Sequence, residues 1–162
     1  MNTRRMTTMK VGGIELSERP LTNLELEYYA HVLNIPNFLG VFMKDEVPHS
    51  KREKTGCGIM NFNTSHQKGS HWVCFWYSTI DRKNIYFDSY AQHVPYELMH
   101  FLKTKREMTQ NSLVIERNAV VVQHLNTSVC GALCLNVLYM LTRQHLPYET
   151  VLTRLQHRYL KK

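Results

Sequence analysis

One segment of this 162-residue chain, residues 130–143, is apolar along most of its length and constrains the fold more than any other. Apolar side chains recur there at the spacing of a helix face, at Leu133, Val137, Leu138 and Leu141. A membrane span would need about 20 consecutive apolar residues, and this stretch falls short. We therefore expect residues 130–143 to form a core helix of a soluble protein, and the chain length suits one domain with one core.

The remaining periodicities divide between helices and strands. Apolar spacing predicts helices over residues 22–33, 95–104 and 147–160, the first capped by Thr22 or Asn23 and the second opened by a proline. Aromatic and β-branched runs predict strands over residues 57–63, 71–79, 84–90, 112–116 and 119–123, the last a buried one. This order predicts an α+β domain in which a small mixed or antiparallel sheet packs against helices.

Two segments lack such a pattern. Residues 34–48 contain Pro36, Gly40 and Pro48, and we interpret them as a structured loop. Residues 1–19 are polar and irregular, which predicts a flexible or loosely docked arm ahead of a single domain at residues 20–162. The first part of this arm is basic and lacks the apolar core of a secretory signal, so we expect an intracellular protein.

The charge balance of the chain is basic. It has 20 Lys and Arg against 13 Asp and Glu, a formal net charge of +7. This composition favours polyanionic partners such as nucleic acid, although a solvated basic surface would have the same composition. The sequence shows no nucleic-acid-binding motif. DNA is therefore a candidate activator, and the sequence itself requires no cofactor.

The four cysteines, Cys57, Cys74, Cys130 and Cys134, are too few for a disulfide framework in a chain of this length. No two are spaced Cys-x-x-Cys and no paired ligand motif is present, so no metal site is expected. Thiols in such a setting are mostly buried and behave as small apolar groups. The functional question is whether one of them has a different environment.

Cys130 has such an environment. It follows the polar turn at residues 126–128 and begins the apolar helix. A thiol at a helix N-terminus meets unpaired backbone N–H groups and the positive end of the helix dipole, which favour the nucleophilic thiolate. Gly131 has no side chain, so a substrate backbone could approach the thiol closely. The alternative is a buried cysteine in a core helix, which is our interpretation of Cys134.

A nucleophilic thiol needs a general base, and the leading candidate among nine histidines is His71. His71 begins a predicted strand at the sheet edge, and Trp72 beside it could form one wall of a cleft. His124 is the second candidate because it is close to Cys130 in sequence. Asp88 lies 17 positions after His71, at the end of the partner strand of a predicted hairpin, and could orient the imidazole. The alternative for Asp88 is an aspartate that only caps a turn.

Acyl transfer also needs hydrogen-bond donors for a developing oxyanion. Gln123 lies seven positions before Cys130 and ends a predicted strand, so its amide could act together with the backbone N–H of Cys130. A polar residue at a strand end is the simpler interpretation of Gln123 alone. The ordered set of histidine, aspartate, glutamine and cysteine, each at an element end, predicts a cysteine protease with Cys130 as nucleophile and His71 as base.

Four segments carry a resemblance to a known family: NFLGVF at residues 37–42, GSHWV at 69–73, YFDSY at 86–90 and QHLNTSVCGALC at 123–134. They resemble the adenovirus protease (adenain) family and, more distantly, the ubiquitin-like-protein-specific proteases. The spacings from histidine to acid and from glutamine to cysteine look the same as in adenain. The likeness extends over roughly residues 36–142.

The resemblance implies a papain-like active site in which the histidine precedes the cysteine. In that family His71 would be the base, Asp88 its orienter, Gln123 an oxyanion-hole donor and Cys130 the nucleophile. The resemblance also implies cleavage after glycine, at Gly-Gly or Gly-x-Gly sites, in capsid and core precursors of a DNA virus or virus-like element during virion maturation. The place of action would be the nucleus or cytoplasm of the host cell and the virion.

Two departures from the family pattern bear on this expectation. Adenain usually has glutamate at the position of Asp88, where the ubiquitin-like-protein proteases have aspartate. Adenain is activated by DNA and by a short viral peptide joined through a disulfide, whose partner cysteine would fall between the second helix and Gln123. Residues 104–122 contain no cysteine, so a disulfide-linked activator is not expected here, whereas DNA remains a candidate.

Other functions stay open on the sequence. The same machinery could serve a deubiquitinase or another ubiquitin-like-protein isopeptidase, or an acyltransferase that uses acyl-coenzyme A. The alternative from another class is a nucleic-acid-binding structural protein that retains an inactive protease fold. The intact set of candidate catalytic residues argues against such decay. For the protease we expect polypeptide substrates, no membrane partner and a monomeric state.

Overall fold

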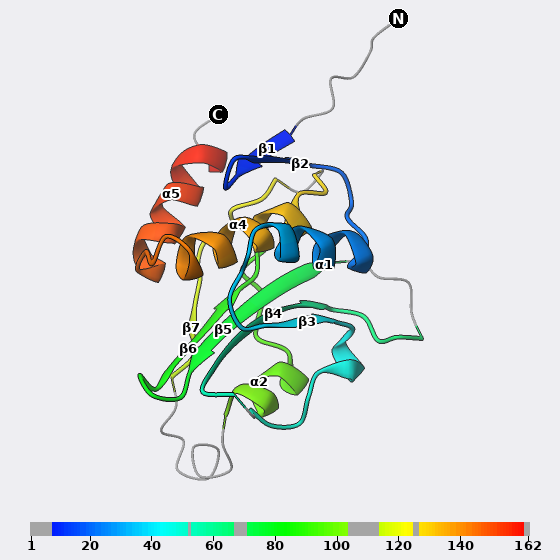
Figure 1. The fold of residues 1–162 in the computed structure, drawn as a ribbon, viewed down its shortest axis with the longest axis vertical. Coiled ribbons are helices and arrows are strands. Elements are labelled where there is room, and N and C mark those ends of the chain that lie inside the picture. Colours follow the sequence, from blue (N-terminus) through cyan, green and yellow to red (C-terminus); the bar gives the residue numbers. More distant parts are fainter. Residues whose placement is uncertain (1–7, 52, 67–70, 104–113, 125–126, 161–162) are drawn as a thin grey trace, which may run out of the picture.

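The computed structural model describes residues 8–51, 53–66, 71–103, 114–124 and 127–160. In this part of the chain a sheet is covered on one face by three helices and on the other by one short helix (Figure 1). The predicted α+β class, a sheet packed against helices, is confirmed. The helices on the first face are α1 (Asn23–Val32), α4 (Cys130–Thr142) and α5 (Tyr148–Leu160), and the helix on the second is α2 (Tyr96–Leu102).

The sheet has five strands in the order β3-β4-β5-β6-β7. The three inner strands are antiparallel neighbours, and the two edge strands pair in parallel with β4 and β6. The sheet is therefore mixed, one of the two forms that the sequence predicted. The strands are β3 (Phe38–Phe42), β4 (Thr55–Asn61), β5 (Trp72–Ser78), β6 (Lys83–Phe87) and β7 (Glu116–Arg117), with a 3₁₀ turn η1 (Lys44–Glu46) after β3.

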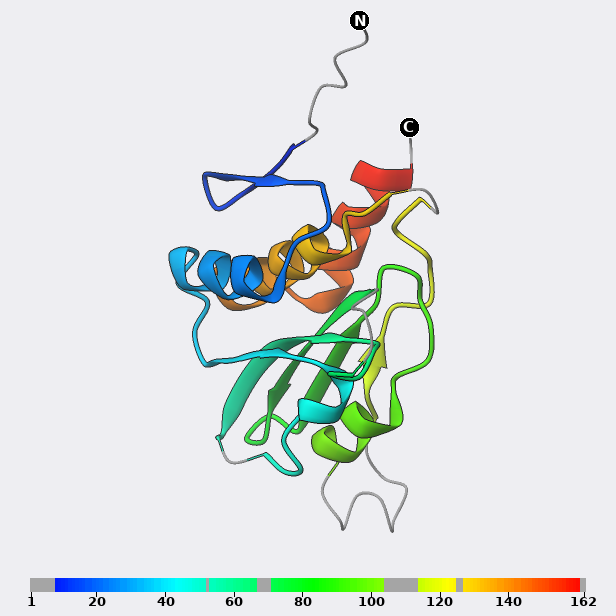
Figure 2. The ribbon, with the colours of Figure 1, turned by 90° about the vertical axis from the view of Figure 1, so that its right-hand side faces the viewer.

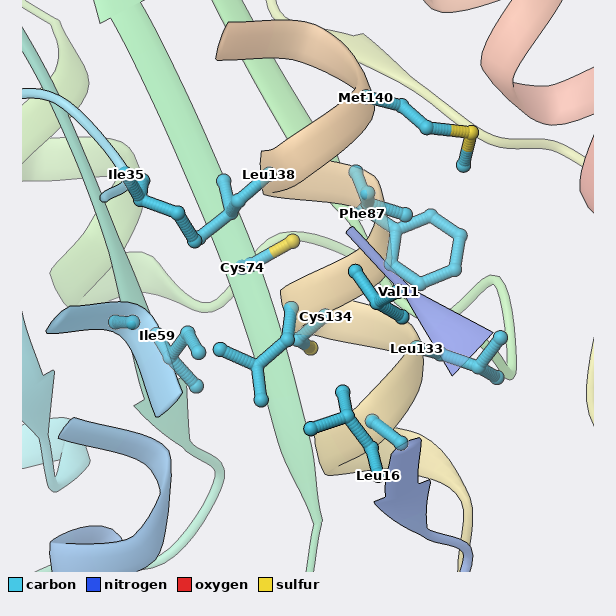
Figure 3. Packing of buried hydrophobic residues seen from close by; sticks show 14 of the residues in the cluster. Val11, Leu16, Ile35, Ile59, Cys74, Phe87, Leu133, Cys134, Leu138 and Met140 are labelled. Atoms are coloured by element: carbon cyan, nitrogen blue, oxygen red, sulfur yellow. The ribbon is translucent and has the colours of Figure 1, made fainter. Parts of the chain in front are cut away.

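Helix α4 lies at the centre of the larger hydrophobic core (Figure 3). All of its residues except Tyr139 and Leu141 are buried, and it contacts β5, α1, α5 and the N-terminal strand β1. Beyond Cys130 the helix contains no ionised side chain, so apolar partners can cover the rest of its surface without burying an unpaired charge. None of the described helices is long and apolar enough to cross a membrane.

A smaller core lies between the opposite face of the sheet and α2. Phe75 and Tyr77 of β5 form edge-to-face contacts with Phe101 of α2, with ring centroids 5.5 Å and 5.6 Å apart. Gly56 and Gly58 of β4 are paired with Tyr77 and Phe75, and a Cβ on either glycine would stand 2.8 Å from the ring of its partner. The glycines therefore leave room for the aromatic side chains that fill this core.

The N-terminal segment differs from the sequence expectation. β1 (Thr8–Val11) and β2 (Ile14–Ser17) form an antiparallel hairpin, which Figure 2 shows on the outer side of the helical layer. Its turn consists of two glycines with φ of 55° and 81°, as a two-residue hairpin turn requires. The predicted flexible or loosely docked arm is therefore wrong for residues 8–17, and residues 1–7 lie outside the described residues. Three hairpin side chains are at most 2% exposed and belong to the larger core: Met9, Val11 and Leu16.

Two further segments differ from the predictions. Residues 38–42, predicted as part of a loop, form β3, whose residues are all half-buried and show no inside–outside alternation. Residues 119–123, predicted as a buried strand, are irregular, and Val120 and Val121 are exposed while Val122 is buried. Of the strand predicted at residues 112–116, the first part lies outside the described residues, and β7 begins only at Glu116.

Candidate active site

The site lies where one end of the sheet meets the N-terminal end of α4. His71 directly precedes β5, Asp88 directly follows β6, and Cys130 is the first residue of α4. Because β5 and β6 are antiparallel, the start of β5 lies beside the end of β6. The backbone of His71 is also fixed from the side of β4, where the N–H of Phe62 donates to the His71 carbonyl at 3.0 Å.

The imidazole of His71 and the carboxylate of Asp88 form a direct polar pair. His71 Nε2 lies 2.6 Å from Asp88 Oδ1, so Nδ1 is the ring nitrogen left for Cys130. Asp88 is fully buried, and its carboxylate oxygens accept hydrogen bonds from the backbone N–H groups of Tyr90 at 2.8 Å and Gln92 at 3.2 Å. A buried carboxylate with this many donors is held in one orientation.

A buried asparagine holds the backbone of Asp88. Asn118 donates from Nδ2 to the Asp88 carbonyl at 2.6 Å, and its Oδ1 accepts from the Asp88 N–H at 3.1 Å. This reciprocal pair continues the β6–β7 pairing beyond Tyr86 and Arg117, with a side chain in place of backbone. The sequence reasoning missed Asn118, because a lone asparagine 30 positions away carries no local signal.

Two aromatic rings lie against the imidazole. The ring centroids of Phe62 and Tyr90 are 5.5 Å and 4.7 Å from that of His71, with interplanar angles of 26° and 30°. These contacts restrict rotation of the imidazole and limit its access to water. Neither ring was identified from the sequence, where aromatic residues beside strands are read most simply as packing residues.

The electrostatic environment of His71 and Cys130 opposes the effect of burial. Burial lowers the pKa of His71, but hydrogen bonds with Asp88 and Cys130 and their charges raise it to about 9. Burial also favours the neutral thiol, yet hydrogen bonds with His71 and the backbone of Trp72 and Gly131 bring the pKa of Cys130 below its ordinary value. The geometry therefore favours a thiolate–imidazolium pair between that lowered pKa and about pH 9.

The side chain of Gln123 lies beside this pair and is 4% exposed. Its Nε2 donates to the carbonyl of Thr127 at 2.8 Å, and its Oε1 accepts from the hydroxyl of Ser89 at 2.5 Å. Gln123 and Cys130 line the same cleft, so the amide can face a group bound at the thiol. His124, the second candidate for the base, is exposed and is not among the described residues that line this cleft.

A cleft of about 390 Å³ opens at Cys130. Trp72 lines it, and the Trp72 indole N–H donates to the Leu21 carbonyl at 2.9 Å, which ties the segment ahead of α1 to β5. Further residues of the cleft lining include Pro20, Leu21, Thr22, Asn23, Met43, Asn61, Tyr90, Thr127 and Ser128.

Gly131 was expected to leave room for a substrate, and the structure gives a different reason for this glycine. It is not among the described residues that line the cleft. A Cβ at Gly131 would stand 3.2 Å from Leu26 and 3.4 Å from Trp72. The missing side chain therefore allows close packing of α4 against α1 and β5, and the contribution of Gly131 at the site comes from its backbone, which bonds the thiol of Cys130.

The other three cysteines are at most 1% exposed and lie away from the cleft, whereas Cys130 is 9% exposed. Burial raises the pKa of Cys57 and of Cys134 well above the ordinary value of a thiol. Cys130 instead combines a lowered pKa with a place in a cleft. Within the described part of the chain, no three His, Cys, Asp or Glu side chains come together in a way that could hold a metal ion.

A thiol, an imidazole and a buried carboxylate beside an amide donor are the groups that nucleophilic catalysis by cysteine requires. In this fold the sheet supplies the histidine and the acid of the candidate site, and the central helix begins with the cysteine. The chain belongs to the adenovirus endoprotease family, whose model matches residues 38–154. This match spans all four candidate catalytic residues and confirms the family resemblance found in the sequence motifs.

Two individual comparisons accompany the family match. The chain is 26% identical over 123 residues to the protease of Porcine adenovirus A serotype 3, an alignment that covers 70% of this chain and 60% of that relative. It is also similar in fold to the crystal structure of an African swine fever virus protease, with a TM-score of 0.53 and 14% identity over 84% of this chain and 62% of the other. The chain thus spans only about 60% of the length of the curated relative.

Proposed function

We propose that this chain is an adenain-like cysteine endopeptidase, with Cys130 as nucleophile, His71 as general base and acid, and Asp88 as the residue that orients His71. The observation that carries this proposal is geometric: His71 and Cys130 line one cleft, and His71 Nε2 lies 2.6 Å from the buried carboxylate of Asp88. A lowered thiol pKa beside a histidine whose pKa rises to about 9 is the environment of an activated nucleophile. Membership of the adenovirus endoprotease family supports the peptidase reaction.

In the proposed mechanism the Cys130 thiolate attacks the scissile carbonyl, and the resulting oxyanion accepts hydrogen bonds from the Gln123 amide and the Cys130 N–H. His71, as imidazolium, protonates the leaving amine, which releases one fragment and leaves the other as a thioester. Neutral His71 then takes a proton from water as that water attacks the thioester, and collapse of this intermediate expels the thiolate. Asp88 keeps the ring aligned and stabilises the imidazolium.

We propose that the substrates are viral precursor proteins, cut after glycine at Gly-Gly or Gly-x-Gly sites during virion maturation. The bulky side chains of Met43, Trp72 and Tyr90 line a cleft of about 390 Å³, which supports a preference for glycine beside the thiol. The porcine adenovirus relative supports a viral setting, within the host cell and the virion. The protein would act as a monomer and without a membrane partner.

Intact-mass analysis tests the proposal, using a peptide that ends in Gly-Gly and carries a thiol-reactive group. We expect a single adduct, on Cys130, that is absent in Cys130→Ala and strongly reduced in His71→Ala. Cys57, Cys74 and Cys134 are internal controls because they are at most 1% exposed and are not among the described residues that line the cleft. Adducts spread over several cysteines, or equal labelling of His71→Ala, would contradict an assembled protease site.

A ubiquitin-like-protein isopeptidase is the second candidate function. It is favoured by the acid at position 88, which is aspartate as in the ubiquitin-like-protein proteases that the sequence more distantly resembles. The two functions share their catalytic groups and differ in the surface that the substrate must fit. Cleavage rates on a ubiquitin-like reporter and on a short Gly-Gly peptide distinguish them, because an isopeptidase would cut the folded reporter far faster than the peptide.

We also propose DNA as an activator of the peptidase. The formal net charge of +7 supports a polyanionic effector. Duplex DNA should raise the rate of peptide hydrolysis, and the stimulation should weaken with added salt because binding releases counterions. A rate that is unaffected by DNA at low salt would reject this role. Salt-sensitive DNA binding without any activity that depends on Cys130 would instead favour the inactive structural protein.

A further inference from the structure

We infer that Ser89 is a positioning residue of the proposed peptidase, and that its hydroxyl determines which way the Gln123 amide faces. This inference rests on the proposed function and adds a residue that makes no direct contact with the substrate. Ser89 is 1% exposed and is not among the described residues that line the cleft. Its effect would therefore act entirely through Gln123.

The contacts of the amide fix its orientation. One end faces the carbonyl of Thr127 at 2.8 Å, and since a carbonyl only accepts hydrogen bonds, that end must be the Nε2 group. The other end is then Oε1, which needs a donor because Gln123 is buried. The hydroxyl of Ser89, at 2.5 Å, provides that donor.

Ser89 is itself held by the chain on both sides. It directly follows Asp88, whose backbone is bonded to Asn118, and the carbonyl of Ser89 accepts from the N–H of Val122 at 2.8 Å. Residues 88–89 therefore run beside residues 118–123 and support two groups of the site at once. Asp88 orients the imidazole, and Ser89 orients the amide of Gln123.

The second hydrogen on Gln123 Nε2 is directed toward the Tyr90 phenol, and the proposed oxyanion would take the place of that phenol as its acceptor. Gln123 lines the cleft together with Tyr90 and Cys130. Burial raises the pKa of Tyr90, and a hydrogen bond with Gln123 opposes this rise, which locates the amide next to the phenol on the cleft side. Without the Ser89 hydroxyl, buried Oε1 loses its donor, and the amide is no longer restrained to present N–H toward the thiol.

Two reactions of Cys130 separate this role from a general structural one. Peptide hydrolysis passes through an oxyanion, whereas alkylation by iodoacetamide displaces iodide and forms no oxyanion. We expect Ser89→Ala to lower kcat by about 10- to 100-fold with little change in KM, somewhat less than complete loss of an oxyanion donor in Gln123→Ala. The rate of Cys130 alkylation should stay at the wild-type value.

Three further variants make the test specific. Ser89→Thr keeps a hydroxyl and should recover most of the lost kcat. Ser78→Ala is the matched control, because Ser78 is also 1% exposed and its hydroxyl donates to Asp81 in the distant turn after β5. In the Gln123→Ala background, Ser89→Ala should have no further effect on kcat, because a residue that acts through Gln123 cannot act without it.

The inference would be overturned if the double variant lost kcat by the product of the two single losses. Equal slowing of hydrolysis and alkylation by Ser89→Ala would also overturn it. A side-chain amide NMR signal, assigned to Gln123 by its loss in Gln123→Ala, adds a readout that needs no catalysis. Ser89→Ala should shift that signal and speed its hydrogen exchange with water, and an unchanged signal would reject the placement. If wild-type protein neither cuts peptides nor is alkylated at Cys130, the proposed function fails while the NMR result still decides the role of Ser89.

Discussion

At the scale of single residues, the protonation of His71 results from opposing influences. Its side chain is 10% exposed and lies against Phe62 and Tyr90, an environment that disfavours a charge. Asp88, whose side chain is 0% exposed, draws its stabilisation from the imidazole and backbone donors rather than from water. Each charge is therefore stable only in the presence of the other, since loss of one would leave the other buried and unpaired.

The pKa of His71, raised to about 9, predicts the alkaline limit of activity. The pH dependence of kcat/KM reports ionisations of the free enzyme, so its alkaline limb should lie near pH 9, where the imidazolium is lost. Asp88→Asn removes the charge that favours imidazolium, so this limb should move to lower pH by about 1–3 units. We also expect kcat to fall by about 10³- to 10⁴-fold. Asp81→Asn, at an exposed turn, is the control, and an unmoved limb in Asp88→Asn would refute the pairing.

Asn118 provides a second prediction at this scale. Asn118→Ala removes both hydrogen bonds to the backbone of Asp88, which should misplace the carboxylate and lower kcat by about 10- to 100-fold. The alkaline limb of the pH profile should shift in the same direction as in Asp88→Asn. Peptide hydrolysis across the pH range measures both effects. If Asn118→Ala lowers thermal stability but leaves the alkaline limb of the pH profile in place, Asn118 stabilises the fold and does not position Asp88.

At the scale of secondary-structure elements, the N-terminal hairpin belongs to the folding unit. Leu16 is 0% exposed and packs in the same core as α4. Leu16→Ala should therefore lower the free energy of unfolding by about 2–5 kcal/mol, as expected when a fully buried leucine is truncated. Urea unfolding measures the change. Glu15→Ala, on the exposed face of the same strand, should have little effect, and equal stability of the two variants would show that the hairpin is only loosely docked.

The elements that could be predicted from the sequence are those with local signals. Helix α4 is marked by its apolar residues, and the spacing of His71 and Asp88 follows from a single hairpin. The β1–β2 hairpin was missed although Gly12-Gly13 is a turn signal, because two strands of four residues each are too short to show a convincing alternation. β3 was missed because Gly40 interrupts a strand whose residues are all half-buried.

The supporting contacts of the site could not be predicted from the sequence. Asn118 and Asp88 are 30 positions apart, and Ser89 and Gln123 are 34 apart. These pairs meet only because residues 118–123 run along the end of β6 as irregular backbone, where no periodicity exists to read. The residues that carry out the proposed chemistry were therefore identifiable by type and spacing, whereas the residues that hold them were not.

At the scale of the whole molecule, the four cysteines report on different parts of one structure. Cys57, Cys74 and Cys134 belong to β4, β5 and α4 and are buried in the core between sheet and helices. Iodoacetamide should therefore label Cys130 in the native protein and the other three only as the protein unfolds. Mass spectrometry across a urea titration should show these three labelled in one common transition. Separate transitions for Cys57 and Cys134 would show that the sheet and α4 do not unfold together.

The position of the site at the boundary between the two layers has a consequence for inactivation. The thiol belongs to the helical layer, while the imidazole and the carboxylate belong to the sheet, and the His71–Cys130 contact spans the boundary. A small displacement of one layer relative to the other breaks this contact before the core has opened to water. Heat, pressure or a destabilising substitution should thus abolish the proposed activity reversibly. This loss should come before the irreversible steps that follow exposure of the core.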